Sequence, residues 1–342
     1  MRKAIAISCA LLVAALPAGA AALDGPAVTV GIAEPSPDLF EDPRFLDTGI
    51  RHARVLVPYD VVRAGGWPLA VADLWLARAR RDGVEPLVSF GHAMSERHRM
   101  RLPSVREYAA RVREFRARYP WVREFSTWNE ANLGSTQPTG RHPRRTAVFY
   151  RALKKQCRGC TVVAVELLLT SNWRMWRWVR AFRARAGRGR LIFGLHNYPD
   201  VTRLRTRATR LFVRRVRNAD IWITETGGIV RHRRFKYNER RAARAVRHAF
   251  RLTSSLRRIE RLYLYNWRDD GNPRWDSGLI ARDGTERRAY WELLGGLTLD
   301  RFRPPTLSPG PVVGPVTGSP VITPGPPPEP EPLPEPPGPD GG

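Results

Sequence analysis

The feature that most limits the possible folds of this chain is a strand-then-helix pattern that repeats eight times. The expected strands are short, nearly continuous apolar runs at residues 28–33, 53–57, 86–90, 122–130, 161–165, 191–195, 221–225 and 262–265. Stretches with helical spacing of apolar positions follow at residues 43–47, 71–81, 105–119, 146–155, 173–186, 206–217, 239–256 and 288–294. Strands that are apolar throughout are typical of a parallel sheet with both faces covered. The pattern therefore predicts an α/β fold, a (β/α)8 TIM barrel.

A doubly wound open sheet is the alternative that the same alternation allows. Such a sheet often carries a Gly-rich phosphate-binding turn after its first strand, and the run that follows residue 33 has two prolines instead. The segment at residues 28–300 also has the usual length of one barrel domain of roughly 250 residues. We therefore expect one barrel domain at 28–300.

The two ends of the chain differ in composition from this segment. Residues 1–22 combine a basic start, an apolar run and a small-residue cleavage site, which predicts a secretory signal peptide. The apolar run is too short for a membrane span, so we expect a secreted or cell-wall-associated protein with no span after cleavage. Residues 304–342 are rich in Pro and Gly, which predicts a disordered, extended tail whose role stays open.

The chain is strongly basic, with a formal net charge of +26. Lys occupies only positions 3, 154, 155 and 236, so the charge comes almost entirely from Arg. These Arg residues are spread along the expected helices and accompany no nucleic-acid motif, which favours solvated helix faces. We therefore expect no nucleic-acid partner, although a polyanion-binding surface stays an alternative.

Two glutamates, Glu130 and Glu225, stand at the ends of the fourth and seventh expected strands. Three strand-helix units separate them, and a barrel brings the carboxyl ends of all its strands to one face. We therefore expect the two carboxylates to meet at the barrel mouth. Two carboxylates that flank a substrate are the usual catalytic groups for cleaving a glycosidic bond.

Other polar and aromatic residues stand at or just after expected strand ends. They are Arg54, His92, Asn129, His196, Tyr198 and Trp267. The set includes Trp-Asn-Glu at 128–130, His-Asn-Tyr at 196–198, Thr-Glu at 224–225 and Tyr-Asn-Trp at 265–267. Taken in strand order, it resembles the catalytic face of the clan A glycoside hydrolases, families 5 and 39 in particular, over residues 28 to 300.

This resemblance implies a retaining glycosidase that acts by double displacement, with Glu130 as general acid/base and Glu225 as nucleophile. Arg54 and Tyr198 would keep Glu225 ionised, although a plain structural salt bridge of Arg54 stays an alternative. His196 would shape the surroundings of Glu130.

Two further contacts with a sugar are expected. Asn129 would hydrogen-bond a sugar 2-hydroxyl, and Trp267 would offer a flat face to a sugar ring. His92 is either a substrate contact or an ordinary loop residue. Glu166, at the end of the fifth strand, receives no role.

Cys157 and Cys160 form a Cys-x-x-Cys pair. A zinc site would need further Cys or His ligands nearby, so a short disulfide is the favoured interpretation for an exported protein.

We expect no metal or other cofactor, a carbohydrate substrate and a monomer. The alternatives are a non-catalytic carbohydrate-binding barrel and a polyanion-binding surface protein. The sugar, the linkage, and endo or exo action do not follow from the sequence.

Overall fold

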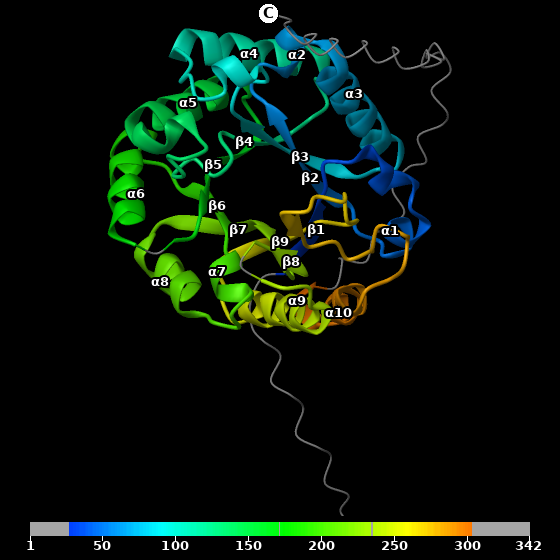
Figure 1. Cartoon of the computed structure of the whole chain (residues 1–342). Coiled ribbons are helices and arrows are strands. Elements are labelled where there is room, and N and C mark those ends of the chain that lie inside the picture. Colours follow the sequence, from blue (N-terminus) through cyan, green and yellow to red (C-terminus); the bar gives the residue numbers. More distant parts are fainter. Residues whose placement is uncertain (1–26, 171, 234, 303–342) are drawn as a thin grey trace, which may run out of the picture. The chain divides into compact units, whose positions relative to one another are not determined.

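The computed structural model describes residues 27–170, 172–233 and 235–302. Its strands close into a barrel in the order β1-β2-β3-β4-β5-β6-β7-β9, and helices surround them (Figure 1). The barrel strands are β1 (Thr29–Ala33), β2 (His52–Pro58), β3 (Glu85–Gly91), β4 (Glu124–Ser126), β5 (Thr161–Leu168), β6 (Leu191–His196), β7 (Ala219–Thr226) and β9 (Ile259–Tyr265). This confirms the predicted (β/α)8 barrel. The expected signal peptide at 1–22 and the expected tail at 304–342 lie outside the described residues.

All barrel strands pair in parallel, and β1 closes the ring by pairing with both β2 and β9. The longer helices are α3 (Gly66–Arg81), α4 (Val105–Arg118), α5 (Pro143–Gln156), α6 (Trp173–Ala186), α8 (Arg207–Arg215), α9 (Glu239–Ser254) and α10 (Arg288–Leu297). Short helices α1 (Pro43–Asp47), α2 (Val61–Ala64) and α7 (Tyr198–Val201) and a two-stranded sheet of β8 (Arg231–His232) and β10 (Trp275–Asp276) lie in the connections. Because the strands are parallel, their carboxyl ends share one face of the barrel.

Helix α4 illustrates how the local sequence sets an element. Ser104 and Glu107 form a reciprocal capping box that satisfies backbone donors at its first turn. Its apolar positions, Tyr108, Val112 and Phe115, are buried against the barrel. None of the described helices is long and apolar enough to cross a membrane.

The two ends of the barrel are closed differently. At the amino end of the strands, Arg261 of β9 pairs with Glu124 at 2.6 Å and covers the ring of Trp222 at 3.9 Å. A disulfide joins Cys157 and Cys160 in the turn before β5, as predicted, with Cα atoms 5.4 Å apart. These features brace the end that lies away from the carboxyl ends of the strands.

The largest difference from the predicted strands concerns β4. It ends at Ser126, so Glu130 is not the last residue of a strand but lies four positions beyond it. The intervening backbone stays between β3 and β5, with Asn129 N–H donating to the Phe90 carbonyl, but it no longer keeps a regular ladder. Glu130 itself has φ of 46°, a left-handed conformation that costs about 1–2 kcal/mol for a residue with a Cβ. The apolar run predicted the direction of the segment but not this turn.

Gly194 of β6 is closely surrounded by buried side chains of the neighbouring strands β5 and β7. A Cβ at this position would lie 2.6 Å from Glu166 Cγ and 2.7 Å from Thr224 Oγ1. We expect Gly194→Ala to lower the free energy of unfolding by about 1–3 kcal/mol, because neither buried neighbour has space to move. Urea unfolding measures the change.

The matched control for that substitution is Gly295→Ala in α10, where a Cβ meets no atom within 4 Å. It should leave stability unchanged or raise it by up to about 1 kcal/mol, because Ala is the better helix former. Equal unfolding midpoints for the two variants would contradict the tight packing around Gly194.

Candidate active site

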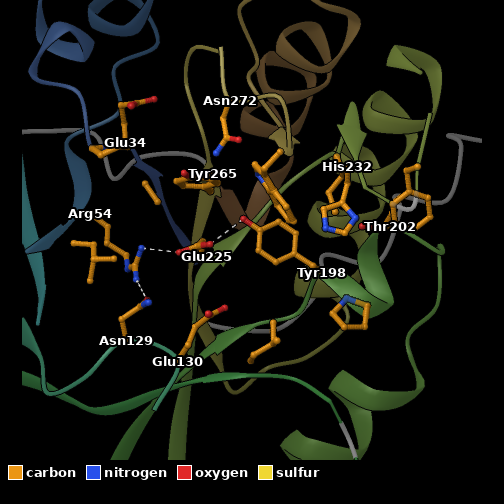
Figure 2. Close-up of a pocket in the computed structure, with 18 of the residues that line it drawn as sticks. Glu34, Arg54, Asn129, Glu130, Tyr198, Thr202, Glu225, His232, Tyr265 and Asn272 are labelled. Atoms are coloured by element: carbon orange, nitrogen blue, oxygen red, sulfur yellow. Dashed lines mark hydrogen bonds and ion pairs between the residues drawn. The ribbon is translucent and has the colours of Figure 1, made fainter. Parts of the chain in front are cut away.

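A pocket of about 810 Å³ opens at the carboxyl ends of the strands, a size typical of small-ligand sites. Figure 2 shows Glu130 and Glu225 projecting into the same space, with Arg54 and Asn129 beside them. Other lining residues are Glu34, Tyr198, His232, Tyr265 and Trp275. The two glutamates therefore share one pocket.

Arg54 of β2 lies beneath the pocket and is only 3% exposed. Its guanidinium donates to Glu166 at 2.6 Å, to Glu225 at 2.9 Å and to Ser89 at 3.0 Å. Burial lowers the pKa of Arg54, but the neighbouring carboxylates outweigh burial and raise it overall. The side chain is thus a permanent cation that ties strands β2, β3, β5 and β7 together.

Asn129 is oriented by the same guanidinium. Arg54 Nη2 donates to Asn129 Oδ1 at 2.6 Å. Because a guanidinium can only donate, this contact fixes the amide oxygen toward Arg54. The amide NH2 group is left as a donor in the pocket wall.

Glu166 of β5 is the buried counter-ion of this cluster and is 0% exposed. It accepts from Arg54 and from the Ser89 hydroxyl at 2.6 Å. Burial would raise its pKa, yet Arg54 and His196 hold the pKa at about 2. The sequence analysis gave Glu166 no role; the signal was a carboxylate inside an apolar strand, which must be paired when buried.

His196 of β6 lies between the two glutamates and is fully buried. Its Nδ1 is 3.1 Å from Glu130 Oε1 and 3.7 Å from Glu225 Oε2, and its Nε2 is 3.4 Å from Glu166. Burial lowers the pKa of His196, but the carboxylates of Glu225 and Glu130 outweigh it and raise the pKa to about 9. His196 is therefore an imidazolium at neutral pH.

The shared imidazole limits the separation of the two pocket carboxylates. Glu130 Oε1 and Glu225 Oε2 cannot lie farther apart than the sum of their distances to His196 Nδ1. That sum leaves room for the roughly 5 Å separation of the two carboxyl groups in retaining glycosidases.

Tyr198 binds the second oxygen of Glu225. Its hydroxyl donates to Glu225 Oε1 at 3.1 Å, while Arg54 binds Oε2 at 2.9 Å. Burial, followed by the charge of Glu225, raises the pKa of Tyr198 well above its usual value, so the phenol stays a donor. Each oxygen of Glu225 therefore accepts a hydrogen bond from one donor.

The sequence-predicted contact of Trp267 is wrong, and for His92 the structure supports the alternative of an ordinary loop residue. Trp267 is only 1% exposed, its indole N–H donates to Asp42 at 3.0 Å and its ring packs on Phe45. The segment after β9 folds back over α1, which removes this ring from the pocket. His92 is half-buried, has its Nδ1 3.0 Å from the Ala93 carbonyl and is not among the described residues that line the pocket.

The aromatic wall of the pocket comes from a later position. Trp275 of β10 lines the pocket and meets the ring of Tyr198 edge to face at 5.0 Å. Tyr265, the last residue of β9, lines the pocket as well. Sequence analysis missed Trp275 because it lies outside the eight barrel strands, in a connection whose course no periodicity reveals.

Glu34, directly after β1, is a third pocket carboxyl group that sequence analysis missed. It accepts backbone N–H groups of Ser36 at 3.0 Å and Trp267 at 2.9 Å. Burial raises its pKa to about 7, against the lowering effect of these hydrogen bonds. It thereby joins the ends of β1 and β9. Among the described residues, no group of three or more His, Cys, Asp or Glu could hold a metal ion.

Comparison with solved structures places this geometry in a known fold. The barrel is similar to a family 5 glycoside hydrolase, subfamily 18, from Streptomyces cattleya in complex with GlcNAc, with a TM-score of 0.60 at 15% identity over 84% of this chain and 83% of that one. It is similar to the endo-1,4-beta-xylanase XylE of Penicillium canescens, with a TM-score of 0.58 at 11% identity over 78% and 93%.

A third similar structure is a family 39 glycoside hydrolase from Bacteroides cellulosilyticus, with a TM-score of 0.55 at 14% identity. The match covers 81% of this chain but only 65% of that enzyme. Neither a family model nor a curated protein sequence matches the chain. The chain thus has the barrel fold of glycoside hydrolases of families 5 and 39, as the resemblance implied.

The protonation of His196 gives a test by pH. Because its pKa is raised from 6.5 to about 9, its stabilising contribution should be fully present below roughly pH 6.5 and lost as the pH rises through about 9. We expect the His196 Hε1 signal in NMR to titrate near pH 9, with a His196→Asn variant identifying the signal. Titration near or below pH 6.5 would contradict the imidazolium between the carboxylates.

Proposed function

We propose that this protein is a secreted retaining glycoside hydrolase that cleaves O-glycosidic bonds of a polysaccharide or glycoside by double displacement. The observation that carries the proposal is that Glu130 and Glu225 both lie next to the imidazole of His196. Of these two glutamates, only Glu225 has a hydrogen-bond donor on each of its carboxylate oxygens. The N-terminal sequence supports export.

The charges of the cluster support different roles for the two glutamates. Arg54 and His196 are cations, and Glu166 and Glu225 are the carboxylates in contact with Arg54. Glu130 has no contact with Arg54, and we therefore assign it the role of general acid/base.

The reaction follows from these roles. Glu225 attacks the anomeric carbon while Glu130 gives its proton to the departing glycosidic oxygen, and a covalent glycosyl-enzyme forms. Water then attacks the same carbon as Glu130 takes its proton, and Glu225 leaves. The free NH2 of Asn129 donates to the sugar 2-hydroxyl, a contact that strengthens in the oxocarbenium-like transition state.

Substitution of the two glutamates tests these roles on any glycoside that the protein hydrolyses. Glu225→Ala should remove hydrolysis. Added azide should restore turnover, because azide can occupy the space vacated by the glutamate and attack the anomeric carbon, which gives a glycosyl azide of inverted configuration. Glu130→Ala should cost about 10²–10⁴-fold with poor leaving groups and much less with activated aryl glycosides. Its azide product should have retained configuration.

The matched control is Glu85→Ala, an exposed carboxylate at the amino end of β3, which should keep full activity. Exchanged azide products would mean that the two roles are reversed. Parental activity in both pocket variants would contradict the proposal and favour a carbohydrate-binding protein.

A further inference from the structure

The exterior of the barrel is not uniformly basic. Helices α5, α6 and α8 follow one another along one side of it (Figure 1). Between Glu130 and Asp220 the sequence contains only two acidic residues, Glu166 and Asp200, and both are buried. Twenty-one Lys and Arg residues lie in the same interval. This side of the barrel therefore exposes cationic side chains and no carboxylate.

The helices on the other side have a different arrangement. There the arginines pair with acids, as in Arg81 with Glu41, Arg118 with Asp73 and Arg247 with Glu292. A general excess of Arg in the sequence explains basic helices, but it does not explain why acids are excluded from three neighbouring helices. This absence of acidic residues from α5, α6 and α8 produces a positive electrostatic potential over them, which raises the local concentration of anions.

A hollow of about 820 Å³ lies in this cationic side, between the start of α5 and the start of α6. Its basic residues are Arg141, Arg144, Arg145, Arg174 and Arg177, and we call it the arginine hollow. No Asp or Glu lines it, and none of its five guanidiniums forms an ion pair within the described part of the chain. Five guanidiniums without a carboxylate partner around one concavity match a ligand with several negative charges.

An aromatic ring completes the arginine hollow. Trp173 is 63% exposed, and the guanidiniums of Arg174 and Arg177 lie 5.6 and 5.8 Å from its ring centroid. An exposed indole of this kind offers a flat apolar face next to positive charge. That combination suits a sugar ring that carries an anionic group better than it suits a simple inorganic ion.

A smaller hollow lies between the arginine hollow and residues at the edge of the catalytic pocket. This smaller hollow, of about 480 Å³, shares Arg141, Arg174 and Trp178 with the arginine hollow and is also lined by Asn132. Asn132 exchanges two hydrogen bonds with the backbone of Leu168, which lines the catalytic pocket. The two sites therefore lie on the same side of the loop after β4, within reach of one chain-like ligand.

We propose that the arginine hollow is a secondary binding site for an acidic polysaccharide, a glycan chain that carries carboxylate or sulfate groups. A role of the arginine hollow for the substrate of the catalytic pocket rests on the proposed glycosidase function, whereas the binding itself does not. Guanidiniums bind the anionic groups in pairs of parallel hydrogen bonds, and Trp173 stacks on a sugar ring of the same chain.

The test is direct binding of polygalacturonate and heparin, with dextran as the neutral glycan. The triple variant Arg144→Ala, Arg174→Ala and Arg177→Ala should lose at least tenfold in affinity for the two acidic glycans. The matched variant Arg113→Ala, Arg240→Ala and Arg244→Ala removes the same charge from exposed positions on α4 and α9 and should bind within twofold of the parent. Trp173→Ala should weaken glycan binding but leave binding of inorganic polyphosphate unchanged.

Equal losses in the two triple variants would mean that only net charge matters, and would overturn the proposal. Tighter binding of single-stranded DNA than of either acidic glycan, lost in the same hollow variant, would assign the surface to nucleic acid instead. The Glu225→Ala protein should bind the acidic glycans as the parent does. A failure of catalysis therefore leaves this binding test intact.

Discussion

The site depends on one buried cation. Arg54 joins Glu166, Glu225, Asn129 and Ser89, and these residues come from β5, β7, the segment after β4, and β3. Removing one partner of a buried ion pair typically costs about 3–5 kcal/mol, because the other charge is left without compensation. The Arg54 guanidinium therefore holds the strand ends together and places a positive charge next to Glu225.

The parallel barrel makes this arrangement possible. It brings residues that are far apart in the sequence to one face, where His196 completes the cluster by touching three carboxyl groups. Glu166 is the buried counter-ion of Arg54, so Glu225 can remain partly exposed to a ligand. The left-handed backbone at Glu130 is local strain at the position proposed for the proton donor, the kind of site where strain commonly occurs.

Residues in or near most strand ends were predictable from the sequence, whereas those of the segment after β9 were not. Strand ends share a face, so Arg54, Glu225, Tyr198 and His196 could be grouped from their positions in the eight units. Trp267 and Trp275 could not be told apart, because the course of the segment after β9 depends on tertiary contacts such as that of Glu34 with the Trp267 backbone. The scarcity of acidic residues between Glu130 and Asp220 is visible in the sequence, but its meaning requires knowing that α5, α6 and α8 are neighbours.

The most direct test of the account is to trap the covalent intermediate. Activated 2-deoxy-2-fluoro glycosides form glycosyl-enzymes that hydrolyse slowly, because the fluorine destabilises the oxocarbenium-like transition state. With a glycoside of the hydrolysed type, mass spectrometry of the digested protein should find one sugar attached to Glu225. Attachment to Glu130 or Glu166, or hydrolysis with inverted configuration and no trapped sugar, would contradict the assignment of Glu225 as the nucleophile held by Arg54 and Tyr198.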